Sequence, residues 1–292
     1  MWQAIKVWGL RKYYRYSSAR AWRDHLDSSD WNALEIPGPA GPIHARMFSD
    51  HSRDDRPLII YFHGGGWVIG DLDTHTPFCQ VLHQRSGCNV IAVDYRLAPE
   101  HPFPAGPDDC LAATRWIAQH CGDFGSNNQR IVLAGDSAGA NLASGTCLEM
   151  ESSLRDRIAG EVVIYPVTQH YSAEFPSYTE RATGQMLTAN FMFWFWDTYL
   201  DSLDPGSNRA ARAFVLASEA LASLPPTFLV TAEYDPLRDE GIAYRDKLCE
   251  AGVDVQYLHF ATAAHGFACS EGPNENFNAM MTDLVAWLGE LA

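Results

Sequence analysis

The chain has 292 residues, 47% of them hydrophobic and 20% charged, which is enough to bury a sizeable hydrophobic core. Its formal net charge of −15 would repel phosphate groups and argues against a nucleic acid partner. The sequence has no run of roughly 18 apolar residues for a membrane span, and its first residues lack a signal-peptide pattern.

Residues 1–30 are expected to form a helix rich in aromatic and basic side chains. One interpretation is an anchor on an anionic bilayer surface, where such side chains are favoured. The other is a segment folded over the body with its aromatic side chains inward. We favour the second, because charges and Gly9 interrupt the apolar face. The aromatic residues are Trp2, Trp8, Tyr13, Tyr14, Tyr16 and Trp22, and the basic ones are Lys6, Arg11, Lys12, Arg15, Arg20 and Arg23.

From residue 33 to residue 165, short apolar runs alternate with helical patterns. The first two runs, within 33–48, flank a Pro/Gly turn and suit an antiparallel pair at the edge of a sheet. The later runs have the uninterrupted apolar character of strands that are buried on both faces. These strands are expected at 58–62, 89–93, 131–134 and 162–165, and helices at 76–86, 108–120 and from the serine motif to about 150.

The alternation stops at 167–216, a stretch rich in aromatic residues. A helix that is apolar on every side, as at 191–196, is buried all round or faces a pocket. Beyond it we expect strands at 227–231 and 255–260 and helices ending near 250 and 291. This order predicts an α/β fold with a mostly parallel central sheet and helices on both faces. We expect one domain, 1–292, with a helical cap drawn from about 1–30 and 167–216.

The motif at Gly135–Gly139 reads Gly-Asp-Ser-Ala-Gly, between an apolar strand and a run of small residues that starts a helix. In that context G-x-S-x-G is typical of a sharp turn that exposes a nucleophilic serine, here Ser137. The two glycines leave room where the strand and the helix cross closely. The serine would project above the carboxyl edge of the sheet, where ligands bind in open α/β folds.

A serine hydroxyl needs a base within hydrogen-bond reach, and that base needs an acid to orient it. Asp235 and His265 each follow a predicted strand, in the chain order that this turn predicts. We therefore expect His265 to act as general base and Asp235 to orient it. The rival acid is Asp239 and the rival base is His259, although Asp239 falls on the next helix and His259 within a strand.

Attack on a carbonyl group places negative charge on its oxygen, which then needs hydrogen-bond donors. The backbone N–H of Ala138, directly after the serine, is one candidate donor. Gly65 and Gly66, in the glycine run after strand 58–62, are expected to supply the others, because glycine lets the main chain approach a substrate. His63 is expected to brace this loop.

Together these motifs resemble the bacterial hormone-sensitive-lipase-like family of α/β-hydrolase esterases. The resemblance rests on segments between residues 58 and 267, namely His63–Trp67 (HGGGW), Asp94–Glu100 (DYRLAPE), Gly135–Gly139 (GDSAG), Asp235–Gly241 (DPLRDEG) and His265–Phe267 (HGF). It implies a triad of Ser137, Asp235 and His265 and an oxyanion hole of Gly65, Gly66 and Ala138. It further implies a cap, no metal, and carboxylic ester substrates with short to medium acyl chains.

The leading hypothesis is thus a serine carboxylesterase that forms an acyl-enzyme intermediate. Hydrolysis of amides, carbamates or lactones by the same residues is one alternative. A catalytically silent scaffold that binds a small ligand is another, and a lipase working at a membrane surface through the N-terminal helix is a third. A homo-oligomer is left open.

We expect an apolar substrate pocket walled by Trp67, Phe191, Trp194 and Trp196 together with part of residues 1–30. Seven scattered cysteines form no C-x-x-C pair, so reduced thiols in the cytoplasm are the simplest interpretation. The sequence has no metal-ligand or nucleotide-binding motif, and we expect neither a metal nor a cofactor.

Overall fold

The computed structural model describes residues 2–25, 31–50, 56–126, 129–184 and 186–291. Their centre is an eight-stranded sheet with the strand order β1-β2-β4-β3-β5-β6-β7-β8. The first three strands in this order pair antiparallel and the others pair parallel. Their bounds are β1 (Asn32–Gly38), β2 (Gly41–Phe48), β3 (Leu58–Phe62), β4 (Val90–Val93), β5 (Ile131–Asp136), β6 (Ile158–Ile164), β7 (Thr227–Tyr234) and β8 (Val255–Ala264). The predicted α/β fold with a mostly parallel sheet is confirmed.

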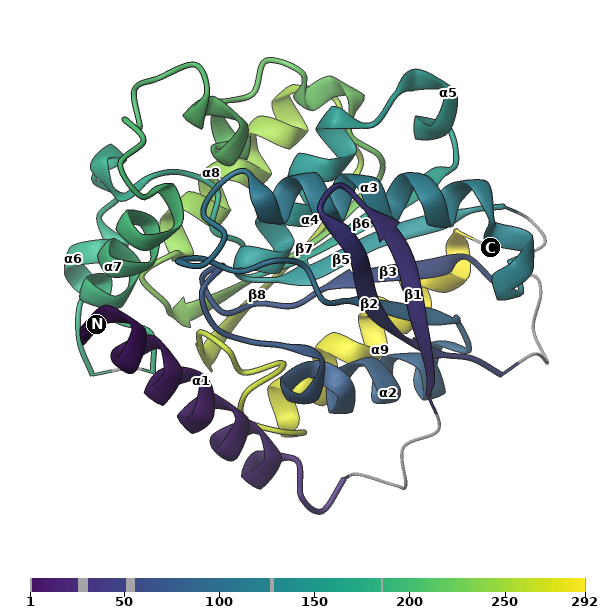
Figure 1. Ribbon diagram of the computed structural model, residues 1–292, viewed down its shortest axis with the longest axis horizontal. Coiled ribbons are helices and arrows are strands. Elements are labelled where there is room, and N and C mark those ends of the chain that lie inside the picture. Colours follow the sequence, from purple (N-terminus) through teal and green to yellow (C-terminus); the bar gives the residue numbers. More distant parts are fainter. Residues whose placement is uncertain (1, 26–30, 51–55, 127–128, 185, 292) are drawn as a thin grey trace.

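Helices cover both faces of the sheet (Figure 1). One face carries α2 (Leu72–Ser86) and α9 (Glu275–Glu290), and the other carries α3 (Ala105–Gln119), α4 (Ala138–Glu149) and α8 (Arg238–Glu250). Successive side chains of a strand point to opposite faces. Accordingly, Ile59 and Tyr61 of β3 join one hydrophobic cluster, while Ile60 and Phe62 join the other. The uninterrupted apolar run of β3 is therefore explained by burial on both sides.

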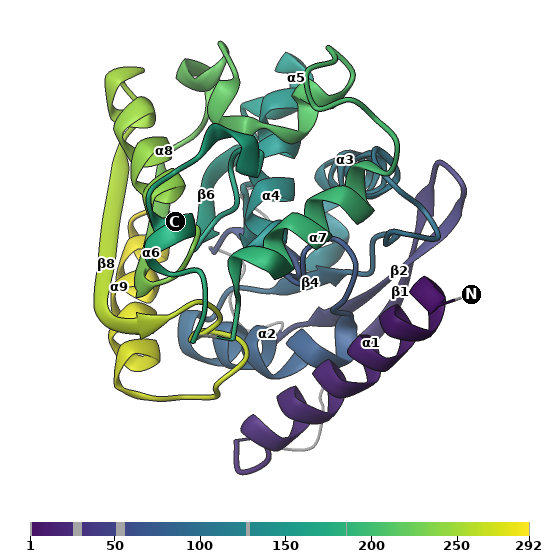
Figure 2. The same cartoon turned by 90° about the vertical axis from the view of Figure 1, so that its left-hand side faces the viewer.

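Two segments far apart in the chain lie over the edge of the sheet where the parallel strands end (Figure 2). One is α1 (Trp2–Ala21), and the other follows β6 and contains α6 (Ser177–Glu180) and α7 (Ala189–Leu200). The remaining elements are the short helix α5 (Ser152–Arg155) and the 3-10 turns η1 (Cys121–Phe124), η2 (Tyr171–Ala173), η3 (Ala210–Ala213), η4 (Val215–Ala217) and η5 (Leu221–Ser223). Across the described ranges, no helix is both long and apolar enough to cross a bilayer.

Several boundaries differ from those expected. Helix α2 begins at Leu72 rather than 76, because Asp71 caps it: its side chain accepts from the Thr74 N–H, and the Thr74 hydroxyl accepts from the Asp71 N–H. Pro77, which is typical of a first turn, lies farther inside the helix. Strand β6 begins at Ile158 rather than 162, and β8 extends to Ala264 rather than 260. The helix expected over residues 1–30 ends at Ala21, with a turn at 22–25, and residues 26–30 lie outside the described residues.

The inward orientation expected for the aromatic residues of the N-terminal segment holds for only part of them. Trp22 is fully buried and donates from its indole nitrogen to the Cys269 carbonyl at 2.7 Å. By contrast, Trp8, Tyr13 and Tyr16 are 64–69% exposed. The reason is helical phase: Trp8 and Tyr16 fall on one stripe of α1 with Tyr13 beside it, on the side away from Val7 and Ser18, which face the body.

Candidate active site

Ser137 lies in the turn between β5 and α4, with φ 54° and ψ −118°. Residues other than glycine rarely adopt positive φ, and such a strained conformation costs roughly 1–3 kcal/mol. The flanking glycines permit this turn: a β-carbon on Gly139 would collide with the Phe62 carbonyl, and one on Gly135 with the backbone of Gly139. The Ser137 N–H donates to the Ile164 carbonyl of the neighbouring strand at 2.8 Å, which fixes the turn to the sheet.

His265 and Asp235 complete a chain of contacts that ends at this serine. The Nε2 atom of His265 lies 3.0 Å from Ser137 Oγ, and its Nδ1 atom lies 2.7 Å from Asp235 Oδ2. The other carboxylate oxygen of Asp235 accepts from the Leu237 N–H at 2.8 Å. All three side chains are buried. If Nδ1–H donates to the carboxylate, Nε2 is left as the acceptor for the serine hydroxyl.

Strand register explains why residues 30 positions apart meet. Asp235 directly follows β7 and His265 directly follows β8, and these strands are parallel neighbours in which Tyr234 pairs with Ala264. The carboxyl ends of parallel strands meet at one edge of a sheet, where Ser137 also lies. The His265 N–H donates to the Tyr234 carbonyl at 3.3 Å, which holds the two loops together.

The rival acid, Asp239, and the rival base, His259, lie away from Ser137. The Asp239 carboxylate accepts from the Ser177 N–H at 2.8 Å and from Arg238 at 2.8 Å. His259 sits within β8, with its Nδ1 atom 2.9 Å from Thr231 Oγ1. Neither contacts Ser137 or His265 in the hydrogen bonds of the described residues.

The loop after β3 carries the three glycines. Gly65 and Gly66 have φ 115° and 59°, and both line the cavity above Ser137. A β-carbon on Gly65 would collide with the Ile69 carbonyl, and one on Gly66 with the Phe195 ring. The Gly65 and Gly66 N–H groups form no hydrogen bond to any other described residue. They are therefore available as donors to a ligand.

The loop is held from below by Asp136, the residue before the serine. Its Oδ1 atom accepts from the Tyr61 hydroxyl at 2.7 Å and from the Gly64 N–H at 2.8 Å. His75 Nε2 lies 3.3 Å from the same oxygen. Burial alone would raise the pKa of Asp136, but the nearby His75 imidazole and the hydrogen bonds from Tyr61 and Gly64 outweigh it and hold the pKa below its usual range.

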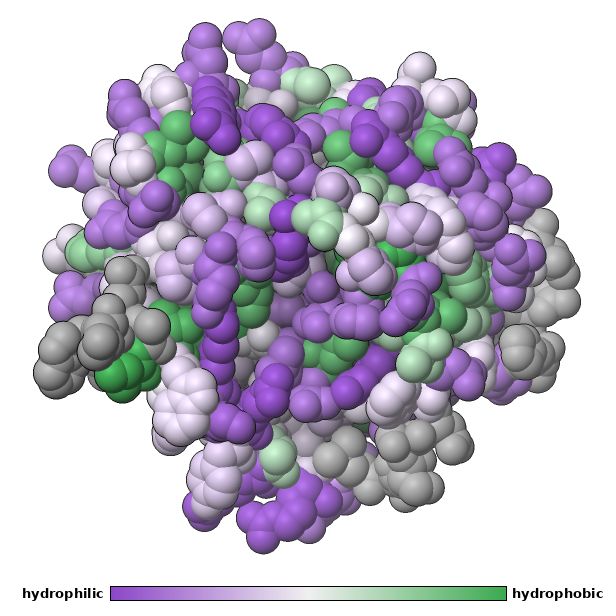
Figure 3. All heavy atoms as spheres, viewed as in Figure 1, coloured by the Kyte–Doolittle hydropathy of each residue, from purple (hydrophilic) through white to green (hydrophobic). Residues whose placement is uncertain are grey.

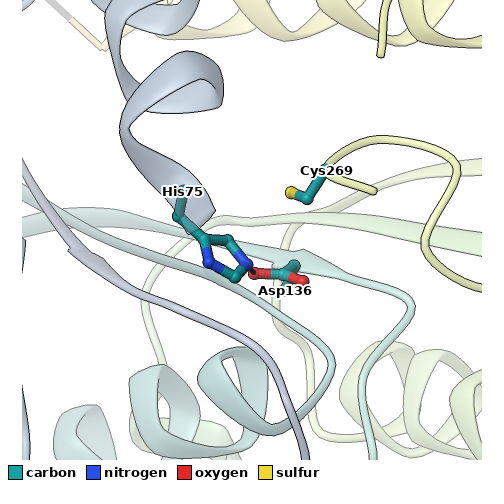
Figure 4. A group of neighbouring side chains, drawn as sticks. All are labelled: His75, Asp136 and Cys269. Atoms are coloured by element: carbon teal, nitrogen blue, oxygen red, sulfur yellow. Dashed lines mark ion pairs between the residues drawn. The ribbon is translucent and has the colours of Figure 1, made fainter. Parts of the chain in front are cut away.

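Figure 4 shows the side chains of His75, Asp136 and Cys269. His75 on α2 points at Asp136, and Cys269 approaches from the loop before α9. The ligand-type atoms of His75, Asp136 and Cys269 lie within 4.8 Å of one another. Asp136 Oδ1 already has two donors, and Cys269 Sγ lies 3.4 Å from the Tyr61 hydroxyl. We therefore interpret the group as a hydrogen-bond network that ties the glycine loop to the serine turn.

His63 occupies the start of this loop. Its Nδ1 atom lies 2.8 Å from the Gly64 carbonyl, and its ring stacks on Tyr95 with centroids 4.4 Å apart. Burial, with a smaller contribution from His75, lowers the pKa of His63 to about 4. A neutral ring that donates to Gly64 matches the bracing role expected from the sequence.

A cavity of about 230 Å³ opens above Ser137 and His265. Leu10, Tyr13, Tyr14 and Ser17 of α1 form one wall. The opposite wall contains Phe191, Met192 and Phe195 of α7, preceded by Met186 and Leu187. The cavity is thus bounded by the two segments that lie over the sheet edge, and most of its lining side chains are apolar.

Of the four residues expected to wall the pocket, only Phe191 lines this cavity. Trp67 is buried against Tyr199, with ring centroids 4.2 Å apart, and Trp196 is fully buried. Trp194 packs on Phe195 and lies beneath Lys6 Nζ, 4.4 Å from its ring centroid. On α7 the correction follows from helical phase: positions 191, 192 and 195 share one side of the helix, and Trp194 and Trp196 point to its other sides.

Part of residues 1–30 lines the cavity as expected, through Leu10, Tyr13, Tyr14 and Ser17 of α1. The lining residues on α7 that the sequence reasoning did not single out are Met192 and Phe195. The 3.6-residue period of this helix was the available signal, because it groups 191, 192 and 195. Which side of α7 faces the cavity depends on residues far away in the chain, on α1 and in the loop after β3, that line the same cavity.

Comparison with known proteins agrees with the fold described above. A family model described as alpha/beta hydrolase fold matches residues 59–269. Esterase LipI of Mycobacterium tuberculosis is 40% identical over 237 residues, covering 80% of this chain and 73% of that protein. Carboxylic ester hydrolase LipN of the same organism is 36% identical, covering 89% of this chain and 71% of that protein.

Among solved structures, the thermostable carboxylesterase EstE1 from a metagenomic library is 31% identical, with a TM-score of 0.90 and coverage of 98% of this chain and 97% of that one. The hyperthermophilic esterase of Pyrobaculum calidifontis is 33% identical, with a TM-score of 0.89 and coverage of 98% and 92%. On the matched motifs, the fold and these relatives, the chain belongs to the hormone-sensitive-lipase-like family of α/β-hydrolase esterases.

Proposed function

We propose that this protein is a serine carboxylesterase that works through an acyl-enzyme intermediate. The observation that carries the proposal is the contact chain Asp235–His265–Ser137, with distances of 2.7 and 3.0 Å. Hydrogen-bonded nucleophile, base and orienting acid are what acyl transfer by serine requires. The names of the similar proteins, esterase and carboxylic ester hydrolase, support the same reaction class.

In the proposed first half-reaction, His265 Nε2 takes the hydroxyl proton as Ser137 Oγ attacks the ester carbonyl carbon. The tetrahedral intermediate then breaks its bond to the alcohol oxygen, and His265 returns the proton to the departing alcohol. In the second half, His265 takes a proton from water, which attacks the acyl-serine. The carboxylic acid leaves, and Ser137 regains its proton. Asp235 holds the imidazole in place and stabilises its positive form.

The oxyanion hole is proposed to consist of the N–H groups of Gly65, Gly66 and Ala138. Support comes from the free N–H groups of the two glycines at the cavity floor and from the position of Ala138 at the start of α4. Losing one such donor typically costs about 2.7–4 kcal/mol of transition-state stabilisation.

The substrate is proposed to be a carboxylic ester with a short to medium acyl chain. A cavity of about 230 Å³ with mainly apolar walls supports a small apolar group beside the ester. We propose that α1 and residues 167–216 act together as a cap on a single domain, because both line this cavity. The cytoplasmic location remains a prediction from the sequence, and a homo-oligomer stays an open alternative.

The decisive experiment compares Ser137→Ala with Ser202→Ala, a matched change at an exposed serine. Ser137→Ala should lower turnover of p-nitrophenyl butyrate by about a thousandfold or more and abolish labelling by a fluorophosphonate, whereas Ser202→Ala should change neither. Circular dichroism checks that both variants are folded. Ester turnover by Ser137→Ala at the wild-type rate would disprove the assignment.

The same assays separate the alternatives. An amidase or lactonase would label with the fluorophosphonate but hydrolyse a p-nitroanilide or a lactone faster than the matched ester. A ligand-binding scaffold without catalysis would show neither labelling nor turnover.

A further inference from the structure

The outward face of α1 gathers large apolar side chains that are mostly exposed to solvent. In the described part of the chain, six large hydrophobic residues are more than a third exposed, and four of them lie on α1. These four are Ile5 (58%), Trp8 (65%), Tyr13 (69%) and Tyr16 (64%). Single exposed apolar residues are ordinary, but a group on one element marks a contact surface.

Helix geometry places these residues together. Positions 5, 8, 12 and 16 are spaced by three and four, so they form one stripe along the helix. The opposite side is fixed to the body: the Ser18 hydroxyl donates to the Thr74 carbonyl at 2.7 Å. In Figure 3, pale and green spheres interrupt the purple surface over α1 at the lower left of the view. We call the stripe of Ile5, Trp8, Lys12 and Tyr16 the outer face of α1.

The charge of this helix is opposite to that of the whole chain. Trp2–Ala21 contains no aspartate or glutamate, although the chain carries −15 overall, and its basic residues are Lys6, Arg11, Lys12, Arg15 and Arg20. Arg11 pairs with Glu100 and Arg15 with Asp71, while Lys12 and Arg20 extend into solvent. Beyond a Debye length of about 8 Å the acidic remainder of the surface is largely screened. The local field of the outer face therefore favours an anionic partner.

The outer face also adjoins the entrance of the catalytic cavity. Tyr13 on α1 and Met186 before α7 both line the cavity, and they are 69% and 53% exposed. Tyr13 directly follows Lys12 of the outer face in the chain. Together with the three apolar residues of that face, Tyr13 and Met186 account for five of the six exposed large apolar residues noted above.

We propose that the outer face of α1 docks on an anionic lipid surface, with the cavity entrance turned toward the lipid. Tryptophan and tyrosine favour the headgroup level of a bilayer, and lysine and arginine favour anionic headgroups. A second copy of the chain fits this face less well, because a two-fold interface would place one basic helix against another. Docking is independent of the ester hydrolysis proposed above, so each can fail without the other.

The test is flotation of the full-length protein with vesicles of phosphatidylcholine alone or mixed with phosphatidylglycerol. The wild type should float with the mixed vesicles at low salt, less at high salt, and not with phosphatidylcholine alone. Lys12→Glu should weaken binding about fivefold or more, and Trp8→Ala combined with Tyr16→Ala should weaken it at least as much. Arg209→Glu is the matched control, since it makes the same charge change at an exposed site outside α1 and should bind nearly as the wild type does.

Turnover of a soluble ester tests the folding and the active site of each variant separately from vesicle binding, because Trp8, Lys12 and Tyr16 do not line the cavity. It should stay within about twofold of the wild type in all variants. The proposal is overturned if the wild type does not float with the mixed vesicles, or if Arg209→Glu weakens binding as much as Lys12→Glu. It is also overturned if light scattering shows a dimer that the Trp8 and Tyr16 changes dissociate, since the face would then bind a second copy.

Discussion

Asp136 connects two parts of the proposed catalytic apparatus. It precedes the candidate nucleophile, and its carboxylate accepts from the Gly64 N–H and the Tyr61 hydroxyl. The peptide that carries Ser137 is thereby tied to the loop that carries Gly65 and Gly66. We therefore regard Asp136 as a positioning residue whose removal would displace the proposed oxyanion donors relative to the serine.

Asp136→Ala should lower kcat by about 10- to 100-fold with little change in KM, because displacement of catalytic groups by about 1 Å can cost that much. Asp136→Asn keeps an acceptor oxygen for Gly64 and should recover much of the lost rate. Steady-state kinetics on p-nitrophenyl butyrate measures both parameters. A wild-type kcat in Asp136→Ala would show that the loop is held without this carboxylate, and a loss confined to stability would assign Asp136 a structural role alone.

At the scale of elements, the two sides of α7 have different surroundings. The side with Phe191, Met192 and Phe195 faces the cavity, while Trp196 is enclosed by Trp67, Tyr199 and other rings. Substitutions on the two sides should therefore have different consequences, one for substrate preference and the other for stability.

Phe191→Ala should enlarge the cavity and shift preference toward longer chains, with the ratio of kcat/KM for a longer ester over a shorter one rising by about tenfold. A series of p-nitrophenyl acyl esters and a series of alkyl acetates would tell whether the acyl or the alcohol group occupies this space. Trp196→Ala is the contrasting variant, which should lower the free energy of unfolding by about 3–5 kcal/mol. An unchanged preference in Phe191→Ala would remove Phe191 from the binding site.

The order of the elements was readable from the sequence because strands buried on both faces leave uninterrupted apolar runs, as at 58–62 and 131–134. The positions of Ser137, Asp235 and His265 were readable because each comes soon after a predicted strand, and ligands bind at the carboxyl ends of the strands in open α/β folds. The direction of the side chains in α1 and α7 could not be predicted from the sequence. In α7 almost every side chain is apolar, so composition does not select the side that faces the cavity, and in α1 the outward aromatic stripe contradicts the usual burial of apolar side chains.

For the whole molecule, a buried acid makes stability depend on pH. Glu161 on β6 is fully buried and accepts from the Thr227 hydroxyl at 3.0 Å. Burial raises its pKa from 4.5 to about 7, although hydrogen bonds from Thr227 and its neighbours oppose the shift. The folded state thus holds this proton more tightly than the unfolded state. The contribution to stability is complete below about pH 4.5 and is lost as the pH rises through about 7.

Other buried groups also have shifted pKa values. Burial also raises the pKa of Glu240, which acts in the same direction, whereas the lowered pKa of His63 acts in the opposite one. A measurement on the wild type alone would therefore mix these effects. A neutral replacement at Glu161 isolates one of them.

Glu161→Gln keeps the shape and an acceptor for Thr227 but has no proton to lose. Urea unfolding near pH 4.5 and near pH 7 should show the variant gaining about 2–3 kcal/mol relative to the wild type as the pH rises, because each pKa unit corresponds to about 1.4 kcal/mol. Glu219→Gln, at an exposed site, should keep a constant difference from the wild type over the same interval. Parallel pH dependence of the Glu161→Gln variant and the wild type would mean that Glu161 is ionised in the folded protein, which in turn would require water or a cation to reach the interior of the sheet beside Thr227.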